Sequence, residues 1–293
     1  MKNNISKKRD FLHPAIQCEI EDVLLEGRSP SANFILIQMF LRNSFLLPTV
    51  PKRLLGLHSH PQEEILELRR KFNNDEFFAG FSPEIKENLF QIVQNIAYAS
   101  IEEDSSAIPQ RERVFFWGNP GCGKTTAAIK LAQLLELPYY QITLRSAREL
   151  STPNLEGSPQ YHPDVKVGWL VEPLLKKMQD LDTTYNNGFL IINDFHHVLF
   201  GSEGAPALAF LLDYLDPAKK EMYHAYFRTP INIRRLNIII TSNQPIPEGD
   251  HSPEDTYAAL RSRIKIIEFP DLREESSKKI LRDYLKELHR FYR

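Results

Sequence analysis

The sequence predicts an α/β fold in which a parallel five-stranded sheet is flanked by helices. From Arg113 onward, short apolar runs alternate with longer segments in which apolar residues recur at helical spacing. Buried strands that alternate with helices are typical of a parallel sheet covered on both faces. The chain has 293 residues, 42% of them hydrophobic and 25% charged, as in an ordinary globular protein with a sizeable core.

Each expected element follows from its local pattern. The strands are the apolar runs at 113–117, 139–144, 189–193, 236–241 and 264–269. The helices between them are expected at 125–135, 168–179, 205–215 and 256–261. Upstream of the sheet, Ser82 can cap a helix whose first position is Pro83, and its apolar face is formed by Ile85, Leu89, Ile92 and Ile96. The segment 273–293 has the pattern of a single amphipathic helix.

Composition argues against some classes of partner. The formal net charge of −2 gives no overall field that would attract nucleic acid or an anionic membrane. The most apolar run, residues 34–41, is too short to span a bilayer. The two cysteines, Cys18 and Cys122, are too few for a disulfide framework and favour a reduced, cytoplasmic compartment. We therefore expect neither a membrane nor a nucleic acid as the partner.

A phosphate-binding loop is the most specific motif in the sequence. Gly118, Gly123, Lys124 and Thr125 fill every fixed position of the G-x-x-x-x-G-K-[ST] pattern, directly after an expected strand and at the start of an expected helix. In such a loop the glycines let backbone amides turn toward the β-phosphate, and the helix N-terminus adds partial positive charge. The lysine spans the β- and γ-phosphates, and the threonine hydroxyl reaches the magnesium ion.

The motif predicts a P-loop NTPase core that binds a nucleotide together with Mg²⁺. The expected nucleotide contacts are Gly118, Asn119, Pro120, Gly121, Cys122, Gly123, Lys124, Thr125 and Thr126. Such a loop alone could belong to a kinase, a GTPase or a motor ATPase.

Polar residues at two later strand boundaries add to the motif. Asn243 follows the strand at 236–241 and could orient an attacking water, although it could also simply begin the turn before Pro245. Arg261 and Arg263 precede the strand at 264–269. One of these arginines could reach the γ-phosphate in a neighbouring subunit, although such a pair is also common on a solvated helix face.

Taken together, these segments resemble the AAA+ ATPase family over about residues 82–293. The shared motifs are Walker A at 118–125, a Walker B-like strand at 189–194, sensor 1 and the arginine-finger box "ALRSRI". The stretch "ALAFLLDYLDPAKKEMYHAYFRTPINIRRLNIIITSNQ" resembles the ATPase module of Lon-type proteases, and so does "GSPQYHPDVKVGWLVEPLLKK". No serine–lysine protease domain is visible in the sequence, so protease activity is not expected.

The resemblance implies roles for single residues. Asn243 would be sensor 1, and Arg263 would be the arginine finger, with Arg261 as the alternative. Trp169 lies near the position of the family's pore-loop aromatic, although it could equally be a core residue at the start of a helix.

The resemblance also divides the chain. Residues 1–80 are expected to form a helical region of unknown role, and residues 81–270 the AAA+ ATP-binding core. Residues 271–293 would be the start of a reduced C-terminal helical lid, in which no sensor 2 arginine can be located.

The segment "GFLIINDFHHVLFG" departs from the family pattern. Members carry two acids at the strand end, one for magnesium and one for the attacking water, whereas Asn193 and Asp194 stand here. An amide brings no charge to the metal site, so Thr125, Asn193 and Asp194 form a weakened set of expected magnesium contacts. In an alternative register Asp194 binds the metal and Phe195 replaces the catalytic acid. Either register predicts slow hydrolysis or none.

The adjacent histidines, His196 and His197, have no second group of metal-binding residues at suitable spacing. A structural or supporting role is therefore expected for them.

Two classes of function remain open. In the first, the protein is a slow Mg-dependent ATPase that forms a homo-oligomer through its arginine-finger face and remodels a protein partner. In the second, it is an ATP-binding interaction module with little or no hydrolysis. A weaker resemblance to superfamily 3 helicases of small DNA viruses rests on the "TSNQ" strand end and gives a third alternative.

Overall fold

A parallel sheet forms the centre of the protein. The computed structural model describes residue 54 and residues 61–100, 111–159, 167–175, 186–201, 204–225, 229–248 and 256–271. Within these ranges the sheet has five strands in the order β2-β3-β6-β1-β7, and every neighbouring pair is parallel. The strands are β1 (Arg113–Trp117), β2 (Tyr139–Thr143), β3 (Asn187–Asn193), β6 (Arg235–Ser242) and β7 (Lys265–Glu268). The predicted α/β fold with a five-stranded parallel sheet is confirmed.

Two inner strands, β3 and β6, explain why the apolar runs in the sequence were so clear. Every residue of β3 and of β6 is buried. Strands covered on both faces read as continuous apolar runs with many β-branched residues, as in Ile191–Ile192 and Ile238–Ile240.

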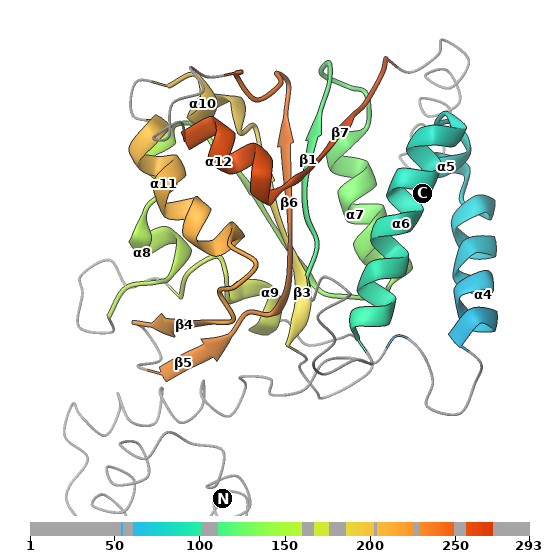
Figure 1. Cartoon of the computed structure of the whole chain (residues 1–293), viewed down its shortest axis with the longest axis horizontal. Helices are drawn as coiled ribbons and strands as arrows, with labels where there is room; N and C mark the ends of the chain where they lie inside the picture. The colour runs from blue at the N-terminus through green and yellow to red at the C-terminus, as the bar shows by residue number, and fades with distance from the viewer. Residues whose placement is uncertain are drawn as a thin grey trace, which may run out of the picture.

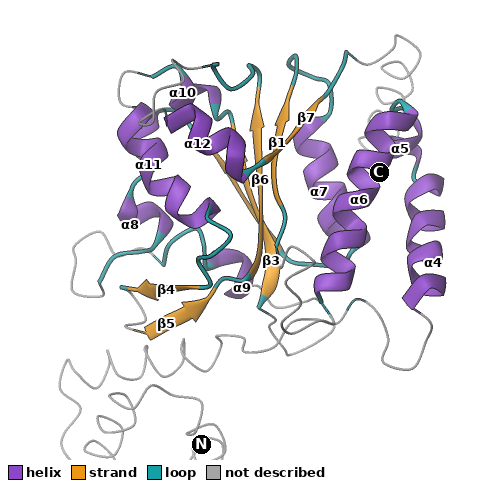
Figure 2. Ribbon diagram, viewed as in Figure 1, coloured by secondary structure: helices purple, strands orange, loops and turns teal. Residues whose placement is uncertain are grey.

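Helices cover both faces of this sheet (Figure 1). On one side lie α4 (Pro61–Asn74), α5 (Glu76–Ala79), α6 (Pro83–Ala99) and α7 (Lys124–Leu134). On the other lie α8 (Thr152–Leu155), α9 (Glu172–Leu175), α10 (His196–Leu199), α11 (Gly204–Leu215) and α12 (Thr256–Arg263), while a short 3-10 turn spans Ala147–Glu149. Figure 2 shows the same three layers by type of element.

Each layer has its own hydrophobic core, because successive side chains of a strand point to opposite faces. In β1, Phe115 packs with the α11 side, whereas Val114 and Phe116 pack with the α6 and α7 side. Helix α6 begins as its sequence predicts: Pro83 occupies its first turn, and the Ser82 hydroxyl accepts a hydrogen bond from the Ile85 amide at 3.4 Å. The four apolar positions predicted for this helix are all buried.

The end of the segment expected as a separate helical region packs on the core. Phe72 of α4 and Phe78 of α5 are each 1% exposed and belong to the same cluster as β1 and α7. Their rings lie 4.2 Å apart and nearly parallel. Residues 61–80 therefore extend the core layer, and the boundary after residue 80 remains a prediction.

Two elements differ from the sequence-based expectation. A hairpin of β4 (Glu221–His224) and β5 (Thr229–Asn232) lies between α11 and β6. It was not predicted because its strands are four residues long and only alternate positions of β4 are buried. A helix was expected at 168–179, but in the structure α9 begins only at Glu172 and is described to Leu175. The residues before it form a turn, because Gly168 has a φ of +94°, which is not helical.

The helices expected before residue 54 and at 273–293 lie outside the described residues. No helix among the described residues is long and apolar enough to cross a membrane.

Candidate nucleotide-binding site

The loop between β1 and α7 has the backbone that its glycines allow. Gly118, Gly121 and Gly123 have φ values of +151°, +84° and +92°. A Cβ atom on Gly118 would lie 2.2 Å from the carbonyl oxygen of Phe269. Gly123 directly precedes α7, so the loop leads into a helix N-terminus whose amides can bind an anion.

Lys124 is folded over this loop. Its side chain is 7% exposed, and the ammonium group donates to the carbonyl oxygens of Gly118 at 2.7 Å and Asn119 at 2.8 Å. The sulfur of buried Cys122 lies 3.5 Å from the same nitrogen. The one cation of the motif is therefore held at the mouth of the loop, where phosphate oxygens can compete for it.

The end of β3 meets the start of α7 through Asn193. Its Oδ1 atom accepts hydrogen bonds from the Thr125 hydroxyl at 2.9 Å and the Thr241 hydroxyl at 3.0 Å. The Asn193 side chain is 5% exposed, and its Nδ2 atom is buried without a hydrogen-bond partner among the described residues. Asn193 is thus the residue of this pair whose side chain contacts Thr125, and the assignment of the metal and catalytic positions stays a prediction.

Asp194 has an unusual backbone. Its φ of +57° lies in the left-handed region, which is uncommon for a residue other than glycine and tolerated by aspartate. The next residue, Phe195, is completely buried, and its amide donates to the Thr241 carbonyl at 3.0 Å. This turn separates the side chains of Asp194 and Phe195, so that Asp194 stays half-buried while Phe195 enters the core.

His196 also belongs to this region. Its ring centre lies 4.2 Å from that of His197, and its Nδ1 atom is buried without a partner among the described residues. Burial lowers the pKa of His196, the neighbouring His197 and Lys124 lower it further, and Asp194 opposes them. His196 is thus within electrostatic reach of both Lys124 and Asp194. The sequence predicts only a structural or supporting role for His196, and its place two residues after Asp194 was the available signal.

Asn243 lies at the same edge of the sheet as the loop. Strand β6 runs between β3 and β1, and Ser242 is opposite Trp117, so Asn243 follows at the level of Gly118. Its side chain is half-buried. The structure therefore brings the strand ends that carry Asn193 and Asn243 to the edge that carries the loop.

The two arginines of α12 are engaged outside this loop. Arg261 donates to the carbonyl oxygens of Pro247 and Glu248. A guanidinium nitrogen of Arg263 lies 3.7 Å from the Asp216 carboxylate, and both side chains are about one-third exposed. Pro247 and Glu248 lie in the segment after β6, and Asp216 follows the end of α11.

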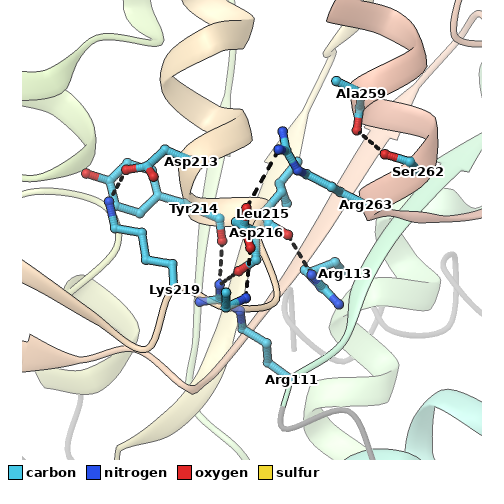
Figure 3. A network of polar contacts seen from close by, with 11 residues as sticks. Arg111, Arg113, Asp213, Tyr214, Leu215, Asp216, Lys219, Ala259, Ser262 and Arg263 are labelled. Carbon is cyan, nitrogen blue, oxygen red and sulfur yellow. Dashed lines mark hydrogen bonds and ion pairs between the residues drawn. The ribbon is translucent and has the colours of Figure 1, made fainter.

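A buried arginine network surrounds Asp216 and was not predicted (Figure 3). Arg111 donates to the carbonyl oxygens of Tyr214 at 2.7 Å and Asp216 at 2.8 Å, and to Ile233 at 3.1 Å. In the same network a guanidinium nitrogen of Arg113 donates to the Leu215 carbonyl at 2.6 Å. These arginines neutralise the carbonyl end of α11, where cations are favoured.

Burial and, to a smaller extent, the nearby Arg113 lower the pKa of Arg111, while Asp216 opposes them, and the pKa is about 10. Little in the sequence indicated this network, because the charged residues "RER" at 111–113 look like a solvent-exposed connector before a strand.

Trp169 lies in the turn before α9, at the edge of the hydrophobic core. Its amide donates to the Asn154 carbonyl at 2.8 Å, and its half-buried ring packs against the α11-side hydrophobic cluster. The described contacts of Trp169 are packing contacts, and its pore-loop role stays a prediction.

The donor set at the end of β3 does not fit a divalent cation well. Thr125 keeps a hydroxyl that such an ion could use, but Asn193 brings no charge. Both lone pairs of its Oδ1 atom already accept hydroxyl hydrogens, and the remaining Nδ2 atom can only donate. Asp194 is the one carboxylate of the expected set. Within the described ranges, no group of three or more His, Cys, Asp or Glu side chains could hold a metal ion.

Comparison with known proteins gives the family. The profile of the "ATPase family associated with various cellular activities (AAA)" matches residues 114–272, which is more than half of the chain. Among curated relatives, Lon protease 2 of Thermus thermophilus is 27% identical over 173 residues, covering 59% of this chain and 19% of the relative. Lon protease of Methanosphaera stadtmanae is 24% identical over 210 residues, covering 71% and 22%.

The mitochondrial Lon protease homolog of Drosophila melanogaster is 26% identical over 198 residues, covering 67% of this chain and 17% of the relative. The chain thus spans about a fifth of the length of these relatives. With the phosphate-binding loop at the edge of a five-stranded parallel sheet, the chain belongs to the AAA ATPase family, and its ATPase region is similar to that of Lon proteases.

Proposed function

We propose that the protein binds ATP in the loop at residues 118–124, hydrolyses it slowly at most, and uses the bound nucleotide to regulate a protein partner. One observation carries this proposal: a complete phosphate-binding loop with Lys124 stands beside a strand end where a neutral amide, Asn193, contacts Thr125. The loop supports ATP binding, and the neutral amide of Asn193 favours slow ATP hydrolysis.

Binding is supported by the charge and dipoles of the loop. Lys124 can exchange its contacts with the Gly118 and Asn119 carbonyls for contacts with phosphate oxygens, which carry more negative charge. The N-terminus of α7 adds amide donors at the same place.

Slow turnover follows from the residues at the end of β3. A hydrolytic water needs a carboxylate placed within about 1 Å of its best position. Asp194 is shorter than the glutamate of the family pattern, and its left-handed backbone sets its direction independently of β3. Without the charge of a second acid beside Thr125, little compensates the negative charge that develops during phosphoryl transfer.

A second candidate function is a remodelling ATPase that works as a homo-oligomer. The position of Arg263 favours it, because the side chain is 32% exposed and its contact with Asp216, at 3.7 Å, is a loose ion pair. Asn243 at the level of Gly118 fits the sensor 1 role. In this version Arg263, or Arg261 in its place, would complete the site of a neighbouring copy. Action in the cytoplasm is part of both candidates.

Two measurements on the purified protein test the proposal: ATP affinity by calorimetry and phosphate release over a range of protein concentrations. We expect ATP binding that is lost in Lys124→Ala and retained in Lys130→Ala. Lys130 is a suitable control because it lies on the same helix and pairs with Asp75 at 3.1 Å, outside the loop.

The outcomes separate the candidates. Wild-type protein that binds no ATP contradicts both. Rapid, Lys124-dependent phosphate release that rises with protein concentration supports the remodelling oligomer instead of the slow site.

A further inference from the structure

Two buried side-chain nitrogens, one at the end of β3 and one at the start of α10, have no hydrogen-bond partner among the described residues. They are Nδ2 of Asn193 and Nδ1 of His196. Buried polar atoms are nearly always paired, and an unpaired one at a candidate site points to a missing ligand contact. Asn193 adjoins the loop through its contact with Thr125, and His196 follows three residues later at the start of α10.

The chemistry of these two atoms favours an anion. The Asn193 amide nitrogen carries two hydrogens and cannot accept, and its orientation is set because Oδ1 receives the hydroxyls of Thr125 and Thr241. A neutral imidazole with its proton on Nδ1 is likewise a donor. In this arrangement neither Asn193 Nδ2 nor His196 Nδ1 has a lone pair to offer a cation.

Among the described residues, the charged groups that act on His196 are Lys124 and Asp194. Lys124 contributes a cation, Asp194 contributes one carboxylate, and His197 lies on the outer side of His196. An amide in place of the first acid removes one carboxylate that would repel phosphate. The absence of this carboxylate matters most when no divalent ion lies between it and the phosphates. Its charge and the phosphate charges would then repel each other directly, and this repulsion is stronger at low dielectric.

We propose that the site holds the terminal phosphates of its nucleotide without a divalent metal ion, with the Asn193 amide and the His196 imidazole as hydrogen-bond donors to the phosphate oxygens. The inference rests on the proposed nucleotide binding and adds how the phosphates are held. It makes the protein a receptor for free nucleotide, with affinity that does not follow the magnesium concentration.

The central test needs no variant. Wild-type protein is dialysed against EDTA, and its affinities for ATP and ADP are measured by calorimetry in EDTA and in excess Mg²⁺. We expect the two dissociation constants for ATP to agree within about threefold. Binding that needs Mg²⁺ overturns this inference and leaves the proposed ATP binding intact. No binding in either buffer contradicts the proposed function itself.

Variants identify the donors. Asn193→Asp reverses the preference, with binding in EDTA weakened by about tenfold or more and binding in Mg²⁺ retained or improved. His196→Phe keeps a ring of similar shape and weakens binding in EDTA by about tenfold, whereas the matched His197→Phe leaves it unchanged. Equal losses at both histidines, or an Asn193→Asp protein without a new Mg²⁺ requirement, remove these residues from the phosphate site. Melting temperatures of the same samples confirm that each variant is folded.

Discussion

The Thr125 hydroxyl donates a hydrogen bond to Asn193 Oδ1 at 2.9 Å, and this contact joins the first turn of α7 to the carboxyl end of β3. A carboxylate at residue 193 would accept the same hydrogen bond and would add a negative charge next to the hydroxyl. Asn193 and an aspartate at the same position therefore differ by one negative charge beside the Thr125 hydroxyl, which is the difference that the proposed metal-free site depends on.

Restoring the acid should restore turnover. We expect Asn193→Asp to raise Mg²⁺-dependent phosphate release by about tenfold, because the new carboxylate supplies the missing charge beside Thr125. Steady-state phosphate release at saturating ATP measures this change. Asn187→Asp is not a suitable control because residue 187 is buried at the other end of β3, so the exposed Asn73→Asp is used. An unchanged rate in Asn193→Asp would mean that Asp194 limits the reaction.

The arginine role is tested by mixing variants. If Arg263 acts on the site of a neighbouring copy, Arg263→Ala and Lys124→Ala are each inactive alone, and a mixture recovers part of the activity. The recovery arises because mixed assemblies contain some sites with an intact loop from one copy and an intact arginine from the other. Arg263→Ala that is fully active by itself excludes this role, and Arg261→Ala is then tested in the same way.

The glycines of the loop should differ in their sensitivity. Gly118→Ala should lower the free energy of unfolding by about 2–4 kcal/mol, because its Cβ atom would lie 2.2 Å from the backbone oxygen of Phe269. Gly121→Ala should cost only about 1 kcal/mol, since no atom lies within 4 Å of its added Cβ and only the left-handed backbone is strained. Denaturant unfolding of the pair measures the difference. Equal losses would contradict the close approach at Gly118.

The arginine network should contribute to stability. Arg111→Met should lower the free energy of unfolding by about 2–4 kcal/mol, because three backbone carbonyls lose their donor in a buried position. The exposed Arg70→Met on α4 serves as the control and should change stability by less than about 0.5 kcal/mol. A small effect at Arg111 would mean that water replaces the guanidinium at the end of α11.

Stability should fall in mild acid because of His224. Burial lowers its pKa to about 4, and a hydrogen bond with the Val167 backbone opposes that shift only partly. Below the unfolded-state pKa of about 6.5 the unfolded chain binds a proton that folded His224 does not, so stability is lost as the pH falls from about 6.5 toward 4. The loss from this group is about 3 kcal/mol. Denaturant unfolding across that pH range, compared with His224→Gln, measures it; an identical slope in both proteins would contradict the assignment.

The parts of the fold that were predictable are those in which local pattern and burial agree. Strands β3 and β6 are buried along their whole length, so their sequences are continuous apolar runs. The loop at 118–124 was also predictable, because its glycines and lysine occur at a spacing that has a direct chemical reason. The hairpin of β4 and β5 was missed since its short strands bury only part of their side chains.

Contacts between segments that are distant in the sequence could not be predicted from local sequence patterns. Nothing local to Arg111 indicates that its guanidinium ends among the last carbonyls of α11, about a hundred residues away (the sequence separation is 103 for Tyr214). The unpaired nitrogen of Asn193 is a similar case, because it depends on two hydroxyls from α7 and β6 that fill the opposite end of the amide. The packing of the half-buried Trp169 ring against the α11-side cluster is a further contact that no local sequence pattern indicates.

The contacts of Lys124 have a thermodynamic consequence. Because its ammonium group already bonds to the carbonyls of Gly118 and Asn119, nucleotide binding is an exchange of partners for an ordered cation. These contacts already restrict the rotamers of the Lys124 side chain, so little further side-chain entropy is lost when a phosphate group binds. The heat of binding should then report a difference between carbonyl and phosphate contacts, and the loop carbonyls act as an internal competitor that sets the affinity.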